Sequence, residues 1–371
     1  RRVMSTHYID NFADDFGPEK VIHLYEPQSQ LRAIVVIDNI SLGPAVGGCR
    51  MAADVSTREV ARLARAMTLK NALANLPHGG AKSAILEDPT HSNKEKLIRS
   101  FALAIKSLTD YIPGPDMGTD EACMAHIHDE IGRAVGSPKT LGGLPLNELG
   151  MTGYGLAIAA DQACEFKDIP LAGARVVIQG FGNVGKAAAR FLMQRDIKLI
   201  ATCDINFGIY NPDGLDIPAL INTEFTETNL GNSRLGKVVD RNSILGIESD
   251  IFIPAARPDV FTEANQHLLN TRLVLEGANI PITHEAAKIL HDRGIVVIPD
   301  IIANSGGVIC AATEYQGLSE SFAYDRVKTT IAANVKELLK QVSDKHLPPH
   351  FIAQQMAQER LAKAMTSRVH V

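Results

Sequence analysis

The sequence has few cysteines, and no two of them form a Cys-x-x-Cys pair. The five are scattered along the 371 residues: Cys49, Cys123, Cys164, Cys203 and Cys310. This spacing argues against a disulfide framework and against the usual zinc-binding motifs. We therefore expect reduced, buried thiols in a cytoplasmic protein that holds no metal.

Long apolar runs and an excess of positive charge are also absent. No stretch reaches the roughly 20 apolar residues that a membrane-spanning helix needs, and the N-terminal segment turns acidic without the apolar region of a signal peptide. The formal net charge of -5 gives no electrostatic reason to bind nucleic acid or an anionic membrane. With 45% hydrophobic and 21% charged residues, the chain is expected to be a soluble globular protein of two domains.

The first part of the sequence predicts a mixture of strands, helices and loops. Residues 31–37, LRAIVVI, form an apolar run typical of a strand. Residues 43–51, GPAVGGCRM, predict a turn or a close approach of two backbones, because glycine is frequent there. We expect a helix at about 93–109, followed by a structured loop at 111–121 that is rich in proline and glycine.

A helix between these segments places one lysine on its apolar side. Ser56 and Glu59 form the capping-box pattern of a helix start. The apolar stripe at helical spacing then runs through Val60, Leu63, Met67 and Ala74, and Lys70 belongs to it. We expect Arg58, Arg62 and Arg65 on the solvated side of the same helix.

The second part of the sequence alternates apolar strands with helices. The expected strands are at 174–180, 197–204, 250–256, 272–278 and 294–300. Continuous apolar strands that alternate with helices predict a parallel, doubly wound sheet with helices on both faces. One or two helices are expected at 324–366.

The fold class is therefore α/β, with two domains and an active-site cleft between them. An N-terminal α/β domain at 1–147 would bind the substrate and form the oligomer contacts. A Rossmann-type, doubly wound dinucleotide-binding domain would occupy 148–327. A hinge or linker is expected at 140–152, and the C-terminal helices at about 328–371 would pack back on the first domain.

A glycine pattern marks the expected cofactor site. Gly180, Gly182 and Gly185 have G-x-G-x-x-G spacing, and they close a predicted strand and open a predicted helix. The phosphates of a dinucleotide would then lie at the helix N-terminus. Asp204 ends the next strand, where its carboxylate would bind the ribose hydroxyls and repel a 2′-phosphate, which favours NAD over NADP. A glycine turn without ligand, a flavin or another nucleotide remain the alternatives.

Two lysines lie among residues that are otherwise apolar or small. Lys82 follows the Gly79-Gly80 pair in NLPHGGAKSAI, and Lys70 lies twelve residues earlier. A lysine partly desolvated beside another cation gives up its proton more readily and can act as a base. The residues alone leave other interpretations open: a helix lysine whose ammonium reaches solvent, a solvated loop lysine, and a plain turn residue for Asp116.

The chain resembles the glutamate/leucine/phenylalanine/valine dehydrogenase family over nearly its whole length. The resemblance depends on seven ordered blocks: GPAVGGCRM, AMTLKNALANLPHGGAKSAI, GPDMGTDE, VVIQGFGNVG, PAARPDVF, LEGANIP and IIANSGGV. It implies oxidative deamination of an L-amino acid with NAD to a 2-oxo acid and ammonium, by a homo-oligomer. It also implies that Lys70 binds the substrate α-carboxylate, that Lys82 is the catalytic lysine and that Asp116 is the catalytic aspartate.

Further site residues follow from the same resemblance. The implied substrate-binding residues are Lys70, Gly48, Val46, Asn279 and Ala311. The implied cofactor-binding residues are Gly180, Gly182, Asn183, Val184, Gly185, Asp204, Ala255, Asn279 and Asn304. In this chemistry Lys82 would take a proton from the water that attacks the iminium carbon, and Asp116 would move protons to and from the nitrogen. Asn279 and Asn304 could instead be simple turn residues.

The substrate side chain is expected to be apolar. Glutamate-specific members of the family hold the side-chain carboxylate with a lysine in the GP-x-K-GG block and a serine after the late GGV block. This sequence has Val46 and Ala311 at those two positions. Because a buried carboxylate without partners costs several kcal/mol, leucine, valine or phenylalanine is favoured over glutamate. GPDMGTDE and GIYNPDGLD are nevertheless closer to glutamate dehydrogenases, and Arg50 or His78 is an alternative partner for a carboxylate.

One rival hypothesis assigns no chemistry to the chain. A catalytically silent, nucleotide-binding regulator could share the same fold and the same glycine pattern. The presence of Lys70, Lys82 and Asp116 together argues against it.

Overall fold

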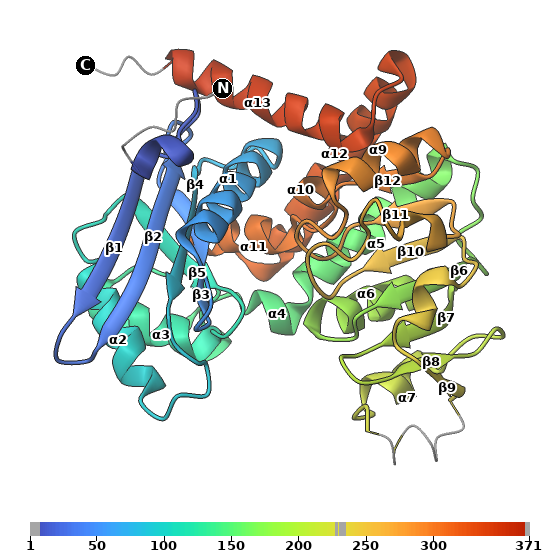
Figure 1. The fold of residues 1–371 in the computed structure, drawn as a ribbon, viewed down its shortest axis with the longest axis horizontal. Coiled ribbons are helices and arrows are strands. Elements are labelled where there is room, and N and C mark those ends of the chain that lie inside the picture. The colour runs from blue at the N-terminus through green and yellow to red at the C-terminus, as the bar shows by residue number, and fades with distance from the viewer. Residues whose placement is uncertain (1–7, 227–228, 230–234, 368–371) are drawn as a thin grey trace. The chain divides into compact units, whose positions relative to one another are not determined.

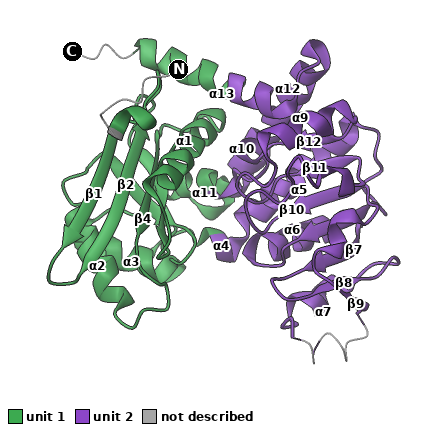
Figure 2. Ribbon diagram, in the orientation of Figure 1, with its two compact units in different colours: residues 1–146, 308–323, 356–371 green, residues 147–307, 324–355 purple. Residues whose placement is uncertain are grey.

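The computed structural model describes residues 8–226, 229 and 235–367. They form two compact units (Figure 2). The first unit comprises residues 1–146, 308–323 and 356–371, and the second comprises residues 147–307 and 324–355. This division differs from the predicted one, which assigned 148–327 to a single domain. Residues 308–323 belong to the first unit, because Ala311 packs in one of its apolar clusters.

The first unit contains a five-stranded mixed sheet in the order β1-β2-β4-β3-β5 (Figure 1). Its strands are β1 (Lys20–Glu26), β2 (Leu31–Asn39), β3 (Ala45–Met51), β4 (Gly80–Ile85) and β5 (Tyr111–Pro115). β3 pairs in parallel with β4 and β5, whereas β2 pairs antiparallel with β1 and β4. The strand predicted at 31–37 is confirmed as part of β2.

The turn predicted at 43–51 and the loop predicted at 111–121 are wrong in part, because each contains a strand. In β3 the glycines allow very close packing of neighbouring backbones: a Cβ on Gly47 would lie 1.6 Å from the carbonyl oxygen of Ala81. β5 is an edge strand, where proline is tolerated. The close backbone approach that the glycines indicated is present, but it lies within a sheet.

Helices cover both faces of this sheet. They are α1 (Thr57–Leu73), α2 (Lys94–Ala104), α3 (Glu121–Ile131) and nearly all of α11 (Gly306–Tyr315), with the 3-10 turns η1 (Tyr8–Asn11) and η2 (Lys139–Leu141). Alternate residues of β2 face opposite sides. Val35 and Ile37 join the cluster with α2 and α3, and Ile34 and Val36 join the cluster with α1.

Helix α1 begins as its sequence predicts. The Ser56 hydroxyl accepts a hydrogen bond from the Glu59 backbone N–H at 3.2 Å, which satisfies a free donor of the first turn. Lys70 lies on the buried side and is only 5% exposed, so this prediction is confirmed. The prediction for Arg65 is wrong, because its guanidinium is partly buried in ion pairs with Asp14 and Asp38.

Replacement of Ser56 by alanine is expected to lower the free energy of unfolding by about 1 kcal/mol, as for other N-caps. Asn93 is a matched control, because it is the N-cap residue of α2 and its side chain makes no capping hydrogen bond. Urea unfolding of Ser56→Ala and Asn93→Ala should therefore give a clear loss for the first variant and a smaller one for the second. Equal losses would contradict the assigned cap.

The second unit contains a seven-stranded sheet in the order β12-β11-β10-β6-β7-β8-β9. Its strands are β6 (Arg175–Gln179), β7 (Lys198–Cys203), β8 (Gly208–Tyr210), β9 (Lys237–Val239), β10 (Ile251–Pro254), β11 (Leu273–Leu275) and β12 (Val296–Ile298). The five predicted strands are all present and parallel to one another. Two short antiparallel strands, β8 and β9, extend this sheet beyond the prediction.

The helices of the second unit alternate with its strands (Figure 1). They are α5 (Met151–Phe166), α6 (Asn183–Met193), α7 (Ile217–Ile221), α9 (His284–Asp292) and α10 (Asp300–Ala303), with α4 (Leu146–Leu149) at the start and the 3-10 turns η3 (Ser243–Gly246) and η4 (Gln266–Leu268). The predicted tail forms two helices, α12 (Glu320–Lys345) and α13 (Pro349–Ser367). Most of α12 belongs to the second unit, which corrects the expectation that the whole tail packs on the first domain. The later part of α13 belongs to the first unit, where Arg360 donates to the carbonyl oxygen of Leu73.

All five cysteines are buried and free. Burial raises the pKa of the Cys49 thiol to about 12. Within the described ranges, no helix combines the length and the apolar character needed to cross a membrane.

Candidate active site

Lys82 and Asp116 form a largely buried ion pair within the first unit. Lys82 lies in β4, and its Nζ donates to Oδ1 of Asp116 at 2.7 Å, directly after the end of β5. The side chain of Lys82 is 4% exposed and that of Asp116 is 14% exposed. The alternatives of a solvated loop lysine and of a plain turn aspartate are therefore wrong.

Arg50 provides a second cation for the same carboxylate. Its Nε donates to Oδ2 of Asp116 at 2.7 Å, and its Nη1 donates to Oε1 of Glu59 at 2.6 Å. Burial raises the pKa of Asp116, but the positive charges of Lys82 and Arg50 lower it by more. The pKa of this carboxyl therefore lies below its ordinary value. Asp116 is therefore held as a carboxylate, and Arg50 is engaged with two acidic side chains instead of being available to a substrate.

Gly48 lies directly beside the ion pair, where the packing is so close that only a residue without a side chain fits. A Cβ at this position would lie 2.8 Å from Cβ of Asp116 and 3.2 Å from Nζ of Lys82. Any larger residue would press on both groups of the pair. Gly48 thus lies next to the two catalytic candidates, and its expected role in substrate binding stays a prediction.

Helix α1 brings the other lysine toward this region. α1 packs on β4 so closely that a Cβ on Gly80 would lie 2.0 Å from the backbone nitrogen of Thr68. Lys70 and Lys82 each lie two residues beyond this contact. Lys70 is buried and has polar or electrostatic partners of its own, so it is not a lysine whose ammonium simply reaches solvent.

An apolar cluster contains the two residues that the resemblance places at the substrate side chain. Val46 and Ala311 are each 4% exposed and form a cluster with Ile112 and Val135. Because Val46 lies two residues before Gly48 in β3, both side-chain positions are on the same face of the sheet. An apolar surface is thus next to the ion pair.

His78 is buried between two other residues of the first unit. Its Nδ1 lies 3.0 Å from the carbonyl oxygen of Pro44, and its ring meets the Tyr315 ring edge-on at 5.5 Å between centroids. The residue is 2% exposed. These contacts fix the ring of His78 inside the first unit, and a role toward a substrate carboxylate stays an alternative.

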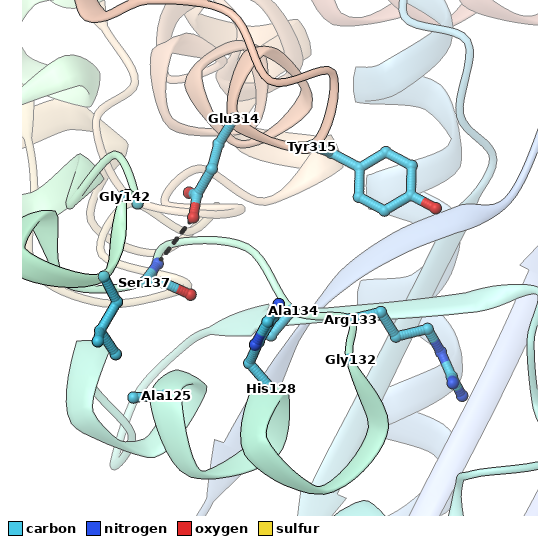
Figure 3. A pocket seen from close by; sticks show the side chains of 11 residues that line it. Ala125, His128, Gly132, Arg133, Ala134, Ser137, Gly142, Glu314 and Tyr315 are labelled. Atoms are coloured by element: carbon cyan, nitrogen blue, oxygen red, sulfur yellow. Dashed lines mark hydrogen bonds between the residues drawn. The ribbon is translucent and has the colours of Figure 1, made fainter.

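A separate pocket of about 260 Å³ lies in the first unit (Figure 3), and neither Lys82 nor Asp116 lines it. Glu314 and Tyr315 come from α11 on one side, and His128 and Arg133 lie on the other. Glu314 accepts hydrogen bonds from the backbone nitrogens of Gly136 and Ser137 at 2.6 and 3.2 Å. The carboxylate therefore fixes the loop that follows α3, and no predicted site residue lines this pocket.

The glycine turn of the second unit has the predicted form. Gly180 has a φ of +99°, which favours glycine. A Cβ on Gly185 would lie 2.0 Å from the carbonyl oxygen of Gly180, whereas one on Gly182 would meet nothing within 4 Å. Helix α6 begins at Asn183 without a side-chain cap, so the N–H groups of its first turn, which includes Val184, are available to phosphate.

The other cofactor candidates surround the carboxyl ends of these strands. Asp204 follows β7, and its Oδ1 accepts hydrogen bonds from the backbone nitrogens of Asn206 and Phe207 at 2.7 and 2.8 Å. This turn leaves Oδ2 as the oxygen available to a ribose. Ala255 follows β10 and lies beside the turn, because a Cβ on Gly180 would contact its carbonyl group at 3.0 Å.

Asn304 carries a buried acceptor with no partner among the residues that the structure describes. Its Nδ2 donates to the carbonyl oxygens of Gly277 and Ala278 and to Oδ1 of Asn279, at 3.3, 3.1 and 3.3 Å. Three oxygens around Nδ2 fix the orientation of the amide. Oδ1 of Asn304 is buried and makes no hydrogen bond there. An amide donor, such as the carboxamide of a nicotinamide, fits this oxygen.

Sequence reasoning missed part of the site. It considered Arg50 only as a partner for substrate and gave Glu59 only a helix-capping role. Arg50 stands in the GPAVGGCRM block and Glu59 in the cap, but neither pattern indicates that Arg50 pairs with both Glu59 and Asp116. For the chain within 8–226 and 235–367, no group of three or more His, Cys, Asp or Glu residues is arranged to hold a metal ion.

Comparison with known proteins agrees with the resemblance. The family model described as glutamate/leucine/phenylalanine/valine dehydrogenase matches residues 142–368, and the model of the Glu/Leu/Phe/Val dehydrogenase dimerisation domain matches residues 18–133. The chain is 37% identical over 292 residues to the catabolic NAD-specific glutamate dehydrogenase RocG of Bacillus subtilis. The aligned region covers 75% of this chain and 68% of the relative. An NADP-specific glutamate dehydrogenase, that of Saccharolobus shibatae, is also among the curated relatives, with 34% identity over 89% of this chain and 83% of the relative.

Solved structures include two similar enzymes. The hetero-hexameric glutamate dehydrogenase of Thermus thermophilus, in a Leu-bound form, matches with a TM-score of 0.85 and 27% identity, over 95% of this chain and 91% of the other. The L-tryptophan dehydrogenase of Nostoc punctiforme matches with a TM-score of 0.72 and 25% identity, over 95% of this chain and 98% of the other.

Proposed function

The chain belongs to the glutamate/leucine/phenylalanine/valine dehydrogenase family, and on that premise we propose that it catalyses the reversible oxidative deamination of an L-amino acid to a 2-oxo acid and ammonium. The buried pair of Lys82 and Asp116, with Gly48 beside it, is the observation that carries the proposal. A lysine and a carboxylate that are held in direct contact suit proton transfer at a carbon that bears nitrogen.

The residues of the chain would divide the reaction between them. A bound nicotinamide supplies the acceptor for the hydride that leaves the substrate Cα. Lys70 would hold the α-carboxylate. Lys82, after its ammonium has released one proton to solvent, would take a proton from the attacking water. Asp116 would carry protons to and from the departing nitrogen, while Gly48 keeps the substrate close to the backbone. Burial of these groups strengthens each electrostatic contact.

For the substrate side chain, we propose an apolar group of the leucine, valine or phenylalanine type. The cluster of Val46 and Ala311 with Ile112 and Val135 supports this choice, because it offers no charge to a second carboxylate. Glutamate is the second candidate, favoured by the names of the curated relatives. A tryptophan dehydrogenase among the similar structures is consistent with an apolar substrate on this fold.

Initial rates of NADH formation with a panel of L-amino acids test both candidates. An apolar substrate should exceed glutamate in kcat/KM by about 10²-fold or more, because an unpaired buried carboxylate costs several kcal/mol. The variant Val46→Lys should raise the rate with glutamate and lower it with leucine, whereas Val135→Ile, a neutral change in the same cluster, should not. Glutamate ahead in the native enzyme would refute the apolar proposal, and no turnover with any amino acid would favour the silent regulator.

For the cofactor, we propose NAD, with NADP less favoured. Asp204 at the end of β7 supports this choice through the repulsion of a 2′-phosphate, although named relatives use one or the other nucleotide. The same assays with NADP⁺ in parallel decide it.

A homo-oligomer formed through the first unit is also part of the proposal. The match of residues 18–133 to a dimerisation-domain model supports it. The five buried free cysteines support a cytoplasmic location.

A further inference from the structure

One residue of the second unit has an unusual backbone conformation. Ile280 has a φ of +49°, in the left-handed region. A β-branched residue rarely adopts this conformation, and strain of this kind gathers at functional sites. Among the described non-glycine residues with positive φ, the others are unbranched at Cβ: Gln30, Asn75, Asp168, Asp196, Asp259 and His346. Ile280 directly follows Asn279, one of the two candidate nicotinamide asparagines.

A chain of hydrogen bonds connects the Ile280 backbone with three titratable side chains, and the Ile280 carbonyl oxygen also accepts from the backbone nitrogen of Asp259 at 2.9 Å. Asp300 Oδ2 accepts from the Ile280 backbone nitrogen at 2.9 Å, and its Oδ1 accepts from the backbone nitrogen of Ile301 at 2.8 Å. The Asp300 backbone nitrogen in turn donates to Oε2 of Glu276 at 2.7 Å. His350, near the start of α13, lies with Nε2 2.8 Å from the other oxygen of Glu276.

The charges in this relay are mutually dependent. Glu276 is 1% exposed and Asp300 is 8% exposed. Burial raises the pKa of Glu276. Burial lowers the pKa of His350, but the neighbouring Glu276 carboxylate raises it by more, so the pKa of His350 is higher than its ordinary value. The Glu276 carboxylate therefore makes His350 easier to protonate than an ordinary histidine.

The short helix α10 connects the relay with the asparagine pair. α10 begins at Asp300, and the Asn304 backbone nitrogen donates to the Asp300 carbonyl oxygen at 3.1 Å. Asn304 then donates to Oδ1 of Asn279 from the other side of the loop. A movement of Asp300 would therefore displace both asparagines together.

We propose that Asp300, Glu276 and His350 are positioning residues, which hold Ile280 in the left-handed conformation and so aim Asn279 and Asn304 at the nicotinamide end of the cofactor. The inference deepens the proposed function and rests on its assignment of a nicotinamide cofactor. The three residues have no direct contact with the substrate in the proposed site. They act through the backbone at Ile280.

Two probes separate the nicotinamide end from the rest of the cofactor. NADH binding is followed by the fluorescence of the reduced nicotinamide, and ADP-ribose, which lacks that ring, competes for the same turn. Asp300→Ala should weaken NADH binding about tenfold, the effect of one lost hydrogen bond, and should leave ADP-ribose binding unchanged. An equal loss for both probes would mean general damage to the unit and would overturn the proposal.

A glycine at position 280 provides the rescue. Because glycine adopts positive φ without strain, Asp300→Ala/Ile280→Gly should recover most of the NADH affinity that Asp300→Ala loses. Asp196 has a φ of +57° in the same unit, so Asp300→Ala/Asp196→Gly is the matched control and should recover none. Failure of Ile280→Gly to rescue, or equal rescue by both glycines, would refute a role through the backbone at 280.

A second variant and a melting temperature without ligand test the same coupling. If Asp300→Ala does not fold, Asp300→Asn retains one acceptor oxygen and should show the same rescue with a smaller loss. The melting temperatures of the single and double variants without ligand should show the same coupling between positions 300 and 280. If the changes in melting temperature are additive, Asp300 does not hold the backbone at Ile280. If the native chain does not bind NADH at all, the proposed function fails, while this ligand-free coupling still decides whether Asp300 holds Ile280.

Discussion

Lys82→Ala is expected to lower kcat by about 10²–10⁴-fold, the range that general acid–base catalysis contributes. The lost ammonium lies 2.7 Å from Asp116 Oδ1 and is almost fully buried, so no solvent-exposed lysine can replace it. The fold should persist, because Asp116 keeps its ion pair with Arg50. Initial rates at saturating substrate and cofactor measure the effect.

The control for this variant is another lysine of the same unit. Lys106 is exposed beyond the end of α2, and Lys106→Ala should retain native turnover. Thermal unfolding of both variants checks that neither has lost its structure. Native turnover in a folded Lys82→Ala enzyme would refute the assigned mechanism and would revive the hypothesis of a protein without catalysis.

Asp116→Ala is expected to lower the free energy of unfolding by about 3–5 kcal/mol, the cost of breaking a buried ion pair from one side. The variant leaves the cations of Lys82 and Arg50 facing each other, with side chains that are 4% and 11% exposed. Arg50 retains Glu59, but that carboxylate is 43% exposed and neutralises it less well. Urea unfolding at neutral pH measures the loss, and Asp213→Ala, at an exposed turn, is the control.

This stabilisation should depend on pH in a defined direction. In the folded enzyme, burial raises the pKa of Asp116, but Lys82 and Arg50 lower it by more, so the pKa is lower than normal. In the unfolded chain the pKa of this carboxyl has its ordinary value of about 3.9. The contribution is therefore fully present above the unfolded value and is lost as the pH falls through the folded value. The difference between native enzyme and Asp116→Ala should shrink below about pH 4. A constant difference through that range would show that the charge of Asp116 is not its source.

The parts of the fold that the sequence predicts are those with a strong local pattern. The strand before Gly180, the turn itself and helix α6 follow from neighbouring residues, because an apolar run, glycine spacing and a helical period occur in order. The short strands β8 and β9 have no such pattern. They exist because they pair antiparallel at the edge of an established sheet, which is a non-local cause. The strand β3 is similar, since its glycines look like a turn until β4 and β5 flank it.

The candidate site shows the same limit. The helical period alone put Lys70 on the buried side of α1, but the pairing of Lys82 with Asp116 depends on the register of β4, β3 and β5. The bridge from Arg50 to Glu59 depends in addition on how α1 lies against that sheet. No spacing in the sequence fixes these relations, because their partners come from separate elements.

The burial of every cysteine gives each unit its own chemical reporter of local opening. A thiol reacts as the thiolate, and burial raises the pKa of Cys49 in the first unit and of Cys164 in the second to about 12. In the native protein a thiol reagent therefore modifies these positions only when the surrounding structure opens. The rate at each cysteine reads out how often its strand or helix separates from its neighbours, so the relative robustness of the two units can be compared in a single labelling experiment without introducing any probe.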